Sequence, residues 1–186
     1  MEIIPYIIAK LQFLFWGYGA STLIFGIFSK ISRLPADNTK RYLSFSNIIA
    51  SYAGLLLVIT LICDLIRSYN IVSDINDTYF AYRLRIFIPF ILLAFAASMF
   101  SLSKKLRGKW IISLLMALVF NICVMIENVF ILWTSLFRDY LPSSWSYYRD
   151  FGISFWLNIL LCATVYFIIV IITMRLQRVL ATNDKR

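Results

Sequence analysis

The residue with the clearest capacity for chemistry is Glu127, which lies with Asn128 inside the otherwise apolar run VMIENVFIL at residues 124–132. Asn121 precedes Asn128 by one heptad and therefore shares its helix face. An isolated carboxylate in hydrocarbon is costly, so Glu127 is expected to be paired, to be protonated, or to touch water in a cavity. One interpretation is a structural glutamate that locks neighbouring helices together, and the other is a proton or cation site open to the outer face of a membrane.

Polar residues in two other apolar runs could complete such a site. Asn158 and Tyr166 lie on one stripe of four-residue steps, and Asn158 is expected at about the depth of Glu127, roughly 13 Å from the outer surface. Lys10 lies about 10 Å inside the first run, where it either pairs with the glutamate or extends its ammonium back to the interface. The candidate ligand- or proton-binding residues are Glu127, Lys10, Asn158, Asn121, Asn128 and Tyr166.

The composition indicates that lipid surrounds these residues. The chain has 186 residues, of which 61% are hydrophobic and 15% are charged, against about 25% charged residues in ordinary soluble domains. We therefore predict an all-α integral membrane protein, with a single domain over residues 1–186 built as a bundle of five transmembrane helices. The expected spans are residues 3–28, 45–66, 86–102, 110–137 and 151–174.

The packing of the bundle is predicted from loop length and from small residues. The connection between the fourth and fifth spans is short, so these two helices are expected to be antiparallel neighbours. Small residues at helical spacing mark close contacts between membrane helices. The stripes are more numerous than a five-helix monomer would use, which favours a membrane-protein partner or a homo-oligomer. The residues expected at helix contacts are Gly19, Gly26, Ala50, Gly54, Ala94, Ser98 and Ala117.

The positive charges predict the orientation of the chain. There are 18 basic and nine acidic residues, and twelve of the basic residues fall in two loops and the tail on one side of the predicted membrane. The positive-inside rule then places the N-terminus outside and the C-terminus inside. A plasma or inner membrane is favoured, with the endoplasmic reticulum as the alternative. We expect anionic lipids, and no nucleic acid, at the inner loop residues Lys30, Arg33, Lys40, Arg41, Lys104, Lys105, Arg107 and Lys109.

Several kinds of chemistry have no support in the sequence. The chain contains no histidine, and its three cysteines, Cys63, Cys123 and Cys162, lie far apart in apolar runs. No motif for a nucleotide, a zinc protease or a serine hydrolase occurs. We therefore expect no catalytic residue, no metal and no cofactor.

One stretch resembles a known family. The residues RYLSFSN at 41–47, ahead of a helix that ends in CDLI at 63–66, resemble the start of the second span of the androgen-induced hydrolases. Ser44 stands where that family has a threonine, and the essential histidine of the family has no counterpart. The likeness covers one helix and implies no function.

The first functional interpretation is a non-enzymatic polytopic protein that works by helix–helix contact, as an integral subunit or regulator of a larger membrane assembly. The alternative is a proton- or cation-coupled carrier or channel for a small solute, centred on Glu127. A lipid-modifying membrane enzyme is the third. The small-residue stripes favour the first interpretation, and the buried carboxylate favours the second.

Overall fold

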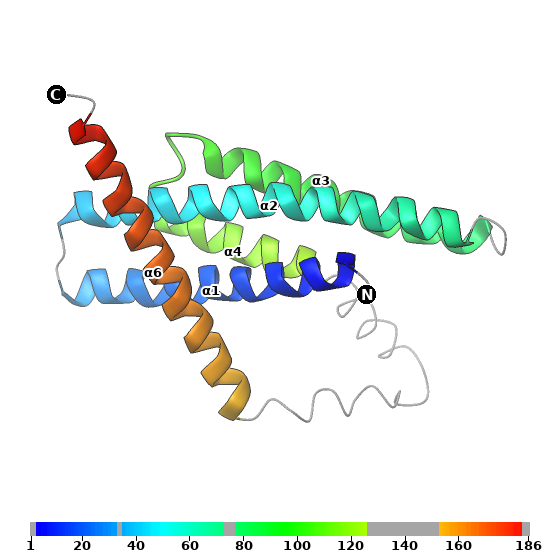
Figure 1. The fold of residues 1–186 in the computed structure, drawn as a ribbon, viewed down its shortest axis with the longest axis horizontal. Coiled ribbons are helices and arrows are strands. Elements are labelled where there is room, and N and C mark those ends of the chain that lie inside the picture. Colours follow the sequence, from blue (N-terminus) through cyan, green and yellow to red (C-terminus); the bar gives the residue numbers. More distant parts are fainter. Residues whose placement is uncertain (1–2, 33–34, 73–76, 126–152, 184–186) are drawn as a thin grey trace.

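The computed structural model describes residues 3–32, 35–72, 77–125 and 153–183, and all regular structure within these ranges is helical. The all-α prediction is therefore confirmed for this part of the chain. In chain order the helices are α1 (Ile3–Ile31), α2 (Ala36–Val72), α3 (Asp77–Leu102), α4 (Trp110–Val124) and α6 (Ile153–Asn183) (Figure 1).

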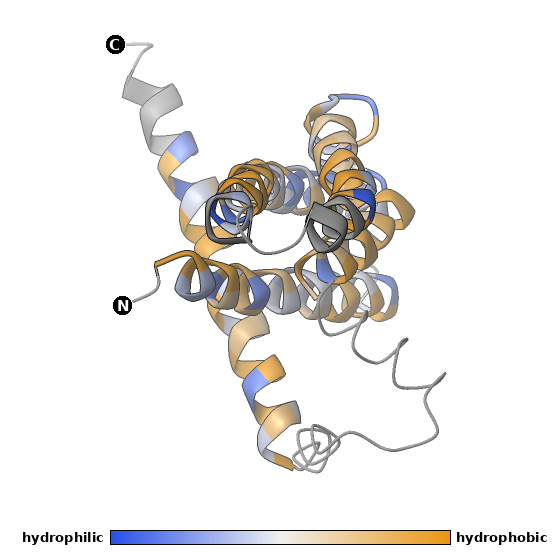
Figure 2. Cartoon of the chain, turned by 90° about the vertical axis from the view of Figure 1, so that its right-hand side faces the viewer, coloured by the Kyte–Doolittle hydropathy of each residue, from blue (hydrophilic) through white to orange (hydrophobic). Residues whose placement is uncertain are grey.

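Four of these helices are long and apolar enough to cross a membrane, and the qualifying stretches are Ile3–Ile31, Asp37–Tyr69, Leu84–Leu102 and Ile153–Gln177. The helices themselves extend beyond the predicted spans, because a helix satisfies its own backbone hydrogen bonds and can continue into water where its side chains become polar. Large apolar side chains remain exposed along their outward faces, which fits contact with lipid. Figure 2 shows that hydrophobic residues predominate along the helices.

The fourth helix is shorter in the described residues than predicted. It ends at Val124, and Met125 follows at the C-cap with φ −95° and ψ 15°. The rest of the predicted span at 110–137, together with Glu127 and Asn128, lies outside the described residues.

The helices α1 to α4 lie side by side, and α6 crosses them at a steep inclination (Figure 1). The most extensive pairing joins α2 and α3, and α1 packs against α2, α4 and α6. In the described residues α6 rests mainly on α1 and makes at most slight contact with α4. The expectation that the fourth and fifth spans are neighbours is therefore wrong for this part of the chain.

The physical reason for the α1–α6 pairing is Gly17, which lets the two backbones approach closely. A Cβ atom at this position would lie 2.6 Å from the carbonyl oxygen of Cys162 on α6. Membrane helices pack most closely where a glycine removes the side chain, and this contact decides which face of the bundle α6 covers.

The small residues singled out in the sequence lie at helix contacts. Gly26 faces the indole of Trp110, and Gly54 faces Ser98 and the ring of Phe120. Because glycine has no side chain, Gly26 leaves room for the Trp110 ring between α1 and α4, and Gly54 leaves room for the Phe120 ring between α2 and α4. The other members of the set are buried or lie against a neighbouring helix: Gly19, Ala50, Ala94 and Ala117.

Candidate anion-binding site at the basic end of the bundle

A buried asparagine organises the end of the bundle where α1 and α3 end and α2 and α4 begin, here called the basic end (left in Figure 1). Asn47 on α2 has no exposed surface. Its Oδ1 accepts a hydrogen bond from the Tyr18 hydroxyl at 2.6 Å, and its Nδ2 donates to the Arg107 carbonyl at 2.6 Å and to the Ser113 hydroxyl at 2.8 Å. Both N–H groups and the amide oxygen are therefore used. The side chain ties α1, α4 and the α3–α4 loop to α2.

The backbone next to this amide holds the remaining helices. The carbonyl of Asn47 accepts hydrogen bonds from Ser51 at 2.6 Å and from Ser101, near the end of α3, at 3.2 Å. The Tyr166 hydroxyl of α6 donates to the carbonyl of Ser46 at 2.7 Å. Two consecutive residues of α2 thus contact all four of the other described helices. Buried hydrogen bonds of this kind fix one arrangement, because a broken bond leaves a polar group unsatisfied in an apolar interior.

The asparagine also positions the loop at residues 103–109. Within this loop, the Ser103 carbonyl accepts from the backbone N–H groups of Leu106 and Arg107, both at 3.1 Å. The Lys109 N–H donates to the Leu106 carbonyl at 3.0 Å. Because the amide of Asn47 holds the Arg107 carbonyl, the loop is fixed both internally and to the bundle.

This loop and the first turns of α2 border an open basic pocket of about 520 Å³. Six of the eight described residues that line it are cationic, and none of the eight is acidic. The volume is in the range of small-ligand sites. The lining residues come from two segments sixty residues apart in the sequence, and they are Lys40, Arg41, Ser44, Lys104, Lys105, Arg107, Gly108 and Lys109.

The start of α4 adds positive potential to this pocket. Lys109 occupies the N-cap with φ −95° and ψ 125°, and no side chain caps the helix. The first N–H groups of an uncapped helix carry the positive end of the helix dipole, which favours a bound anion. Next to it, the Lys30 Nζ lies 4.7 Å from the centre of the Trp110 ring. The electrostatics of this end therefore favour a multiply charged anion.

The polar residues predicted to surround Glu127 are not joined to one another by hydrogen bonds in the described part of the chain. Tyr166 bonds to α2, as above, and the Asn121 Nδ2 donates to the carbonyls of Phe15 at 3.2 Å and Ala117 at 2.7 Å. Asn158 is exposed on α6, and Lys10 is exposed with its Nζ 5.0 Å from the centre of the Tyr6 ring. The proton or cation site thus stays a prediction.

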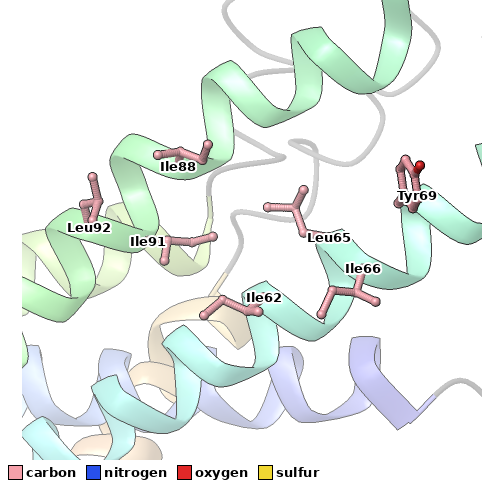
Figure 3. A pocket seen from close by; sticks show the side chains of 7 residues that line it. All are labelled: Ile62, Leu65, Ile66, Tyr69, Ile88, Ile91 and Leu92. Atoms are coloured by element: carbon pink, nitrogen blue, oxygen red, sulfur yellow. The ribbon is translucent and has the colours of Figure 1, made fainter. Parts of the chain in front are cut away.

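A second cavity has a different character. A groove of about 450 Å³ lies between α2 and α3, and Figure 3 shows aliphatic side chains of both helices along it. Its only polar group is the phenol of Tyr69. Such a lining suits hydrocarbon and offers no charge to an anion. The full lining is Ile62, Leu65, Ile66, Tyr69, Ile88, Ile91 and Leu92.

Sequence reasoning did not single out Asn47, although it is the centre of the site. A usable signal exists, because Asn47, Ser51 and Gly54 follow i, i+4, i+7 spacing and so share one face of an apolar helix. The basic residues of both loops were predicted as lipid contacts, and the structure places Lys40, Arg41, Lys104, Lys105, Arg107 and Lys109 around one pocket. Arg33 lies outside the described residues.

The sequence matches no protein-family model, no curated protein and no solved structure. The resemblance to the androgen-induced hydrolases therefore has no support beyond residues 41–47 and 63–66. In the described ranges no group of three or more cysteine or acidic residues could hold a metal ion.

Proposed function

We propose that the chain is a non-enzymatic polytopic membrane protein that acts as an integral subunit or regulator of a larger membrane assembly. In this proposal α6 meets a membrane-spanning helix of the partner, while the basic end faces the inner side of the membrane and anionic lipid. The orientation follows from the positive-inside rule. The observation that carries the proposal is the outward face of α6.

The helix α6 contributes little of its surface to the bundle. Only 17% of its most apolar window is buried, against 39% for α1 and 44% for α2. Within the surface of α6 that the described residues leave exposed lies Asn158, whose amide would face hydrocarbon without a partner. A polar amide in a membrane is stabilised when a partner helix supplies a hydrogen bond, which contributes about 0.6–2 kcal/mol.

The apolar residues near this asparagine have the spacing of a helix–helix contact. From Asn158 the exposed positions follow steps of three, four, three and four residues, the pattern of the two core positions of a heptad. A single asparagine in such a seam fixes the register of the two helices. The seam is Asn158, Leu161, Val165, Ile168 and Ile172.

The test compares two matched variants in the native membrane. Asn158→Leu removes the exposed amide, and Thr164→Val removes a hydroxyl that already donates to the Leu160 carbonyl of its own helix at 2.9 Å. After mild solubilisation, the fraction of the chain in the complex is measured by native mass and by in-membrane cross-linking. We expect Asn158→Leu to weaken the complex about 3- to 30-fold, corresponding to the loss of one interhelical hydrogen bond. Thr164→Val should leave it unchanged.

Three results would contradict the proposal. The first is a wild-type chain that migrates alone under all mild conditions. The second is a complex that tolerates Asn158→Leu as well as Thr164→Val. The third is proton-driven solute flux by the purified chain alone that is abolished by Glu127→Gln, which would support the carrier interpretation.

A further inference from the structure

The basic pocket is a concentration of positive charge, and the acidic residue of the same helix turn, Asp37, is not among its lining residues. Its six cations lie around about 520 Å³, and no acidic side chain is among the lining residues. Like charges held close together repel one another, so the arrangement stores unfavourable energy that a bound anion relieves. Basic residues that serve only the positive-inside rule have no need to converge on one cavity.

The pocket is also held in shape before any ligand binds. Its loop is anchored by the hydrogen bond from Asn47 to the Arg107 carbonyl and by the internal bonds to Ser103. A preorganised loop loses little conformational freedom on binding, which increases affinity. The hydrogen-bonded loop distinguishes this pocket from the mobile polybasic segments of other proteins, which attract anionic surfaces without a defined geometry.

The position of the pocket points to a ligand at the membrane surface. The first turns of α2 carry Lys40 and Arg41 at the beginning of the apolar stretch Asp37–Tyr69. Trp110 starts α4 beside the pocket and donates its indole N–H to the Thr22 carbonyl at 3.3 Å. A tryptophan at a helix end is typical of headgroup depth, and basic pockets at the ends of membrane helices bind lipid headgroups.

The charge of the site selects among anions. A phosphodiester headgroup offers one negative charge on its phosphate, whereas a phosphomonoester carries about −1.5 to −2 at pH 7 with three acceptor oxygens. Arginine and lysine side chains, together with an uncapped helix N-terminus, suit the second group better. We propose that this pocket binds one phosphomonoester group, presented by the headgroup of an anionic membrane lipid. The proposal does not depend on the partner contact of α6.

The test measures lipid binding to the purified full chain in phosphatidylcholine nanodiscs. Nanodiscs doped with phosphatidic acid, a phosphomonoester lipid, are compared with nanodiscs doped with phosphatidylserine at the same surface charge. The pocket variant is Lys104→Gln with Arg107→Gln, which keeps the Arg107 carbonyl that Asn47 holds. The control is Arg85→Gln with Arg175→Gln, which removes the same charge from exposed positions that do not line the pocket.

We expect one tight site for phosphatidic acid per chain, weakened at least about tenfold in the pocket variant and less than about threefold in the control. Unchanged thermal unfolding of both variants shows that the fold is intact. Equal losses in both variants, or equal affinity for the two lipids, would show diffuse attraction and overturn the proposal. Displacement by inorganic phosphate at the same concentration as the lipid would identify a soluble ligand and overturn the assignment to a lipid.

Discussion

Replacing Gly17 by alanine will separate α6 from α1 and destabilise the bundle by about 3 kcal/mol, at the upper end of the range for overpacked contacts. The new Cβ atom would lie 2.6 Å from the carbonyl oxygen of Cys162, 3.0 Å from its carbonyl carbon and 3.1 Å from the Cβ atom of Tyr166. Two of these atoms belong to the backbone, so rotation of a side chain cannot remove the clash. The measurement is thermal unfolding of the purified chain in mild detergent.

The matched control is Gly19→Ala, two residues further along the same helix. Its Cβ atom would lie 3.5 Å from the Ala117 Cβ atom and 3.6 Å from the Asn121 Nδ2, which is ordinary van der Waals contact. Alanine also has a higher helix propensity than glycine by about 1 kcal/mol. Gly19→Ala should therefore be neutral or slightly stabilising. A Gly17→Ala protein that is as stable to heat as the Gly19→Ala protein would mean that the close approach of α6 at Gly17 is absent in the membrane-extracted protein.

The difference between these two glycines shows what the sequence could predict about packing. The apolar runs predicted where helices lie, because only a helix satisfies its backbone within lipid. Small residues predicted that close contacts exist, and Gly19 was chosen because it forms a regular step with Gly26. Gly17 was not chosen, since it lies outside the regular step from Gly19 to Gly26. The expectation that the fourth and fifth spans are neighbours failed in the described residues for a different reason, because loop length constrains helix neighbours only weakly.

The candidate site was predicted in part. Charge placement predicted one strongly basic side, since topology depends on lysine and arginine near the ends of spans. It could not predict that the start of α2 and the α3–α4 loop form one pocket, because this depends on how α2, α3 and α4 pack. The spacing of Asn47, Ser51 and Gly54 marks one face of α2, but it does not identify the partners of Asn47, which are residues 18, 101, 107 and 113.

Replacing Asn47 by leucine tests whether this buried amide holds the basic end together. The substitution removes the amide partner of the Tyr18 hydroxyl, the Arg107 carbonyl and the Ser113 hydroxyl. The Tyr18 and Ser113 hydroxyls still donate to the carbonyls of Ser113 and Lys109, so the main loss falls on the Arg107 carbonyl. A buried polar group that loses its partner costs about 1–3 kcal/mol, and a destabilisation of this size is expected. The measurement is again thermal unfolding of the purified chain.

Asn47→Leu also tests whether the geometry of the loop contributes to lipid binding, because the substitution removes no charge from the pocket. When the Arg107 carbonyl is released, the loop at residues 103–109 loses its hydrogen bond to α2, and the cations of the pocket are no longer held together. Because the preorganised geometry is lost, the affinity for phosphatidic acid should fall about tenfold. Asn158→Leu, the same substitution at an exposed position, should change neither the unfolding of the isolated chain nor its lipid affinity. An Asn47→Leu protein with wild-type lipid affinity would show that charge alone determines binding, and that the buried amide serves stability without shaping the pocket.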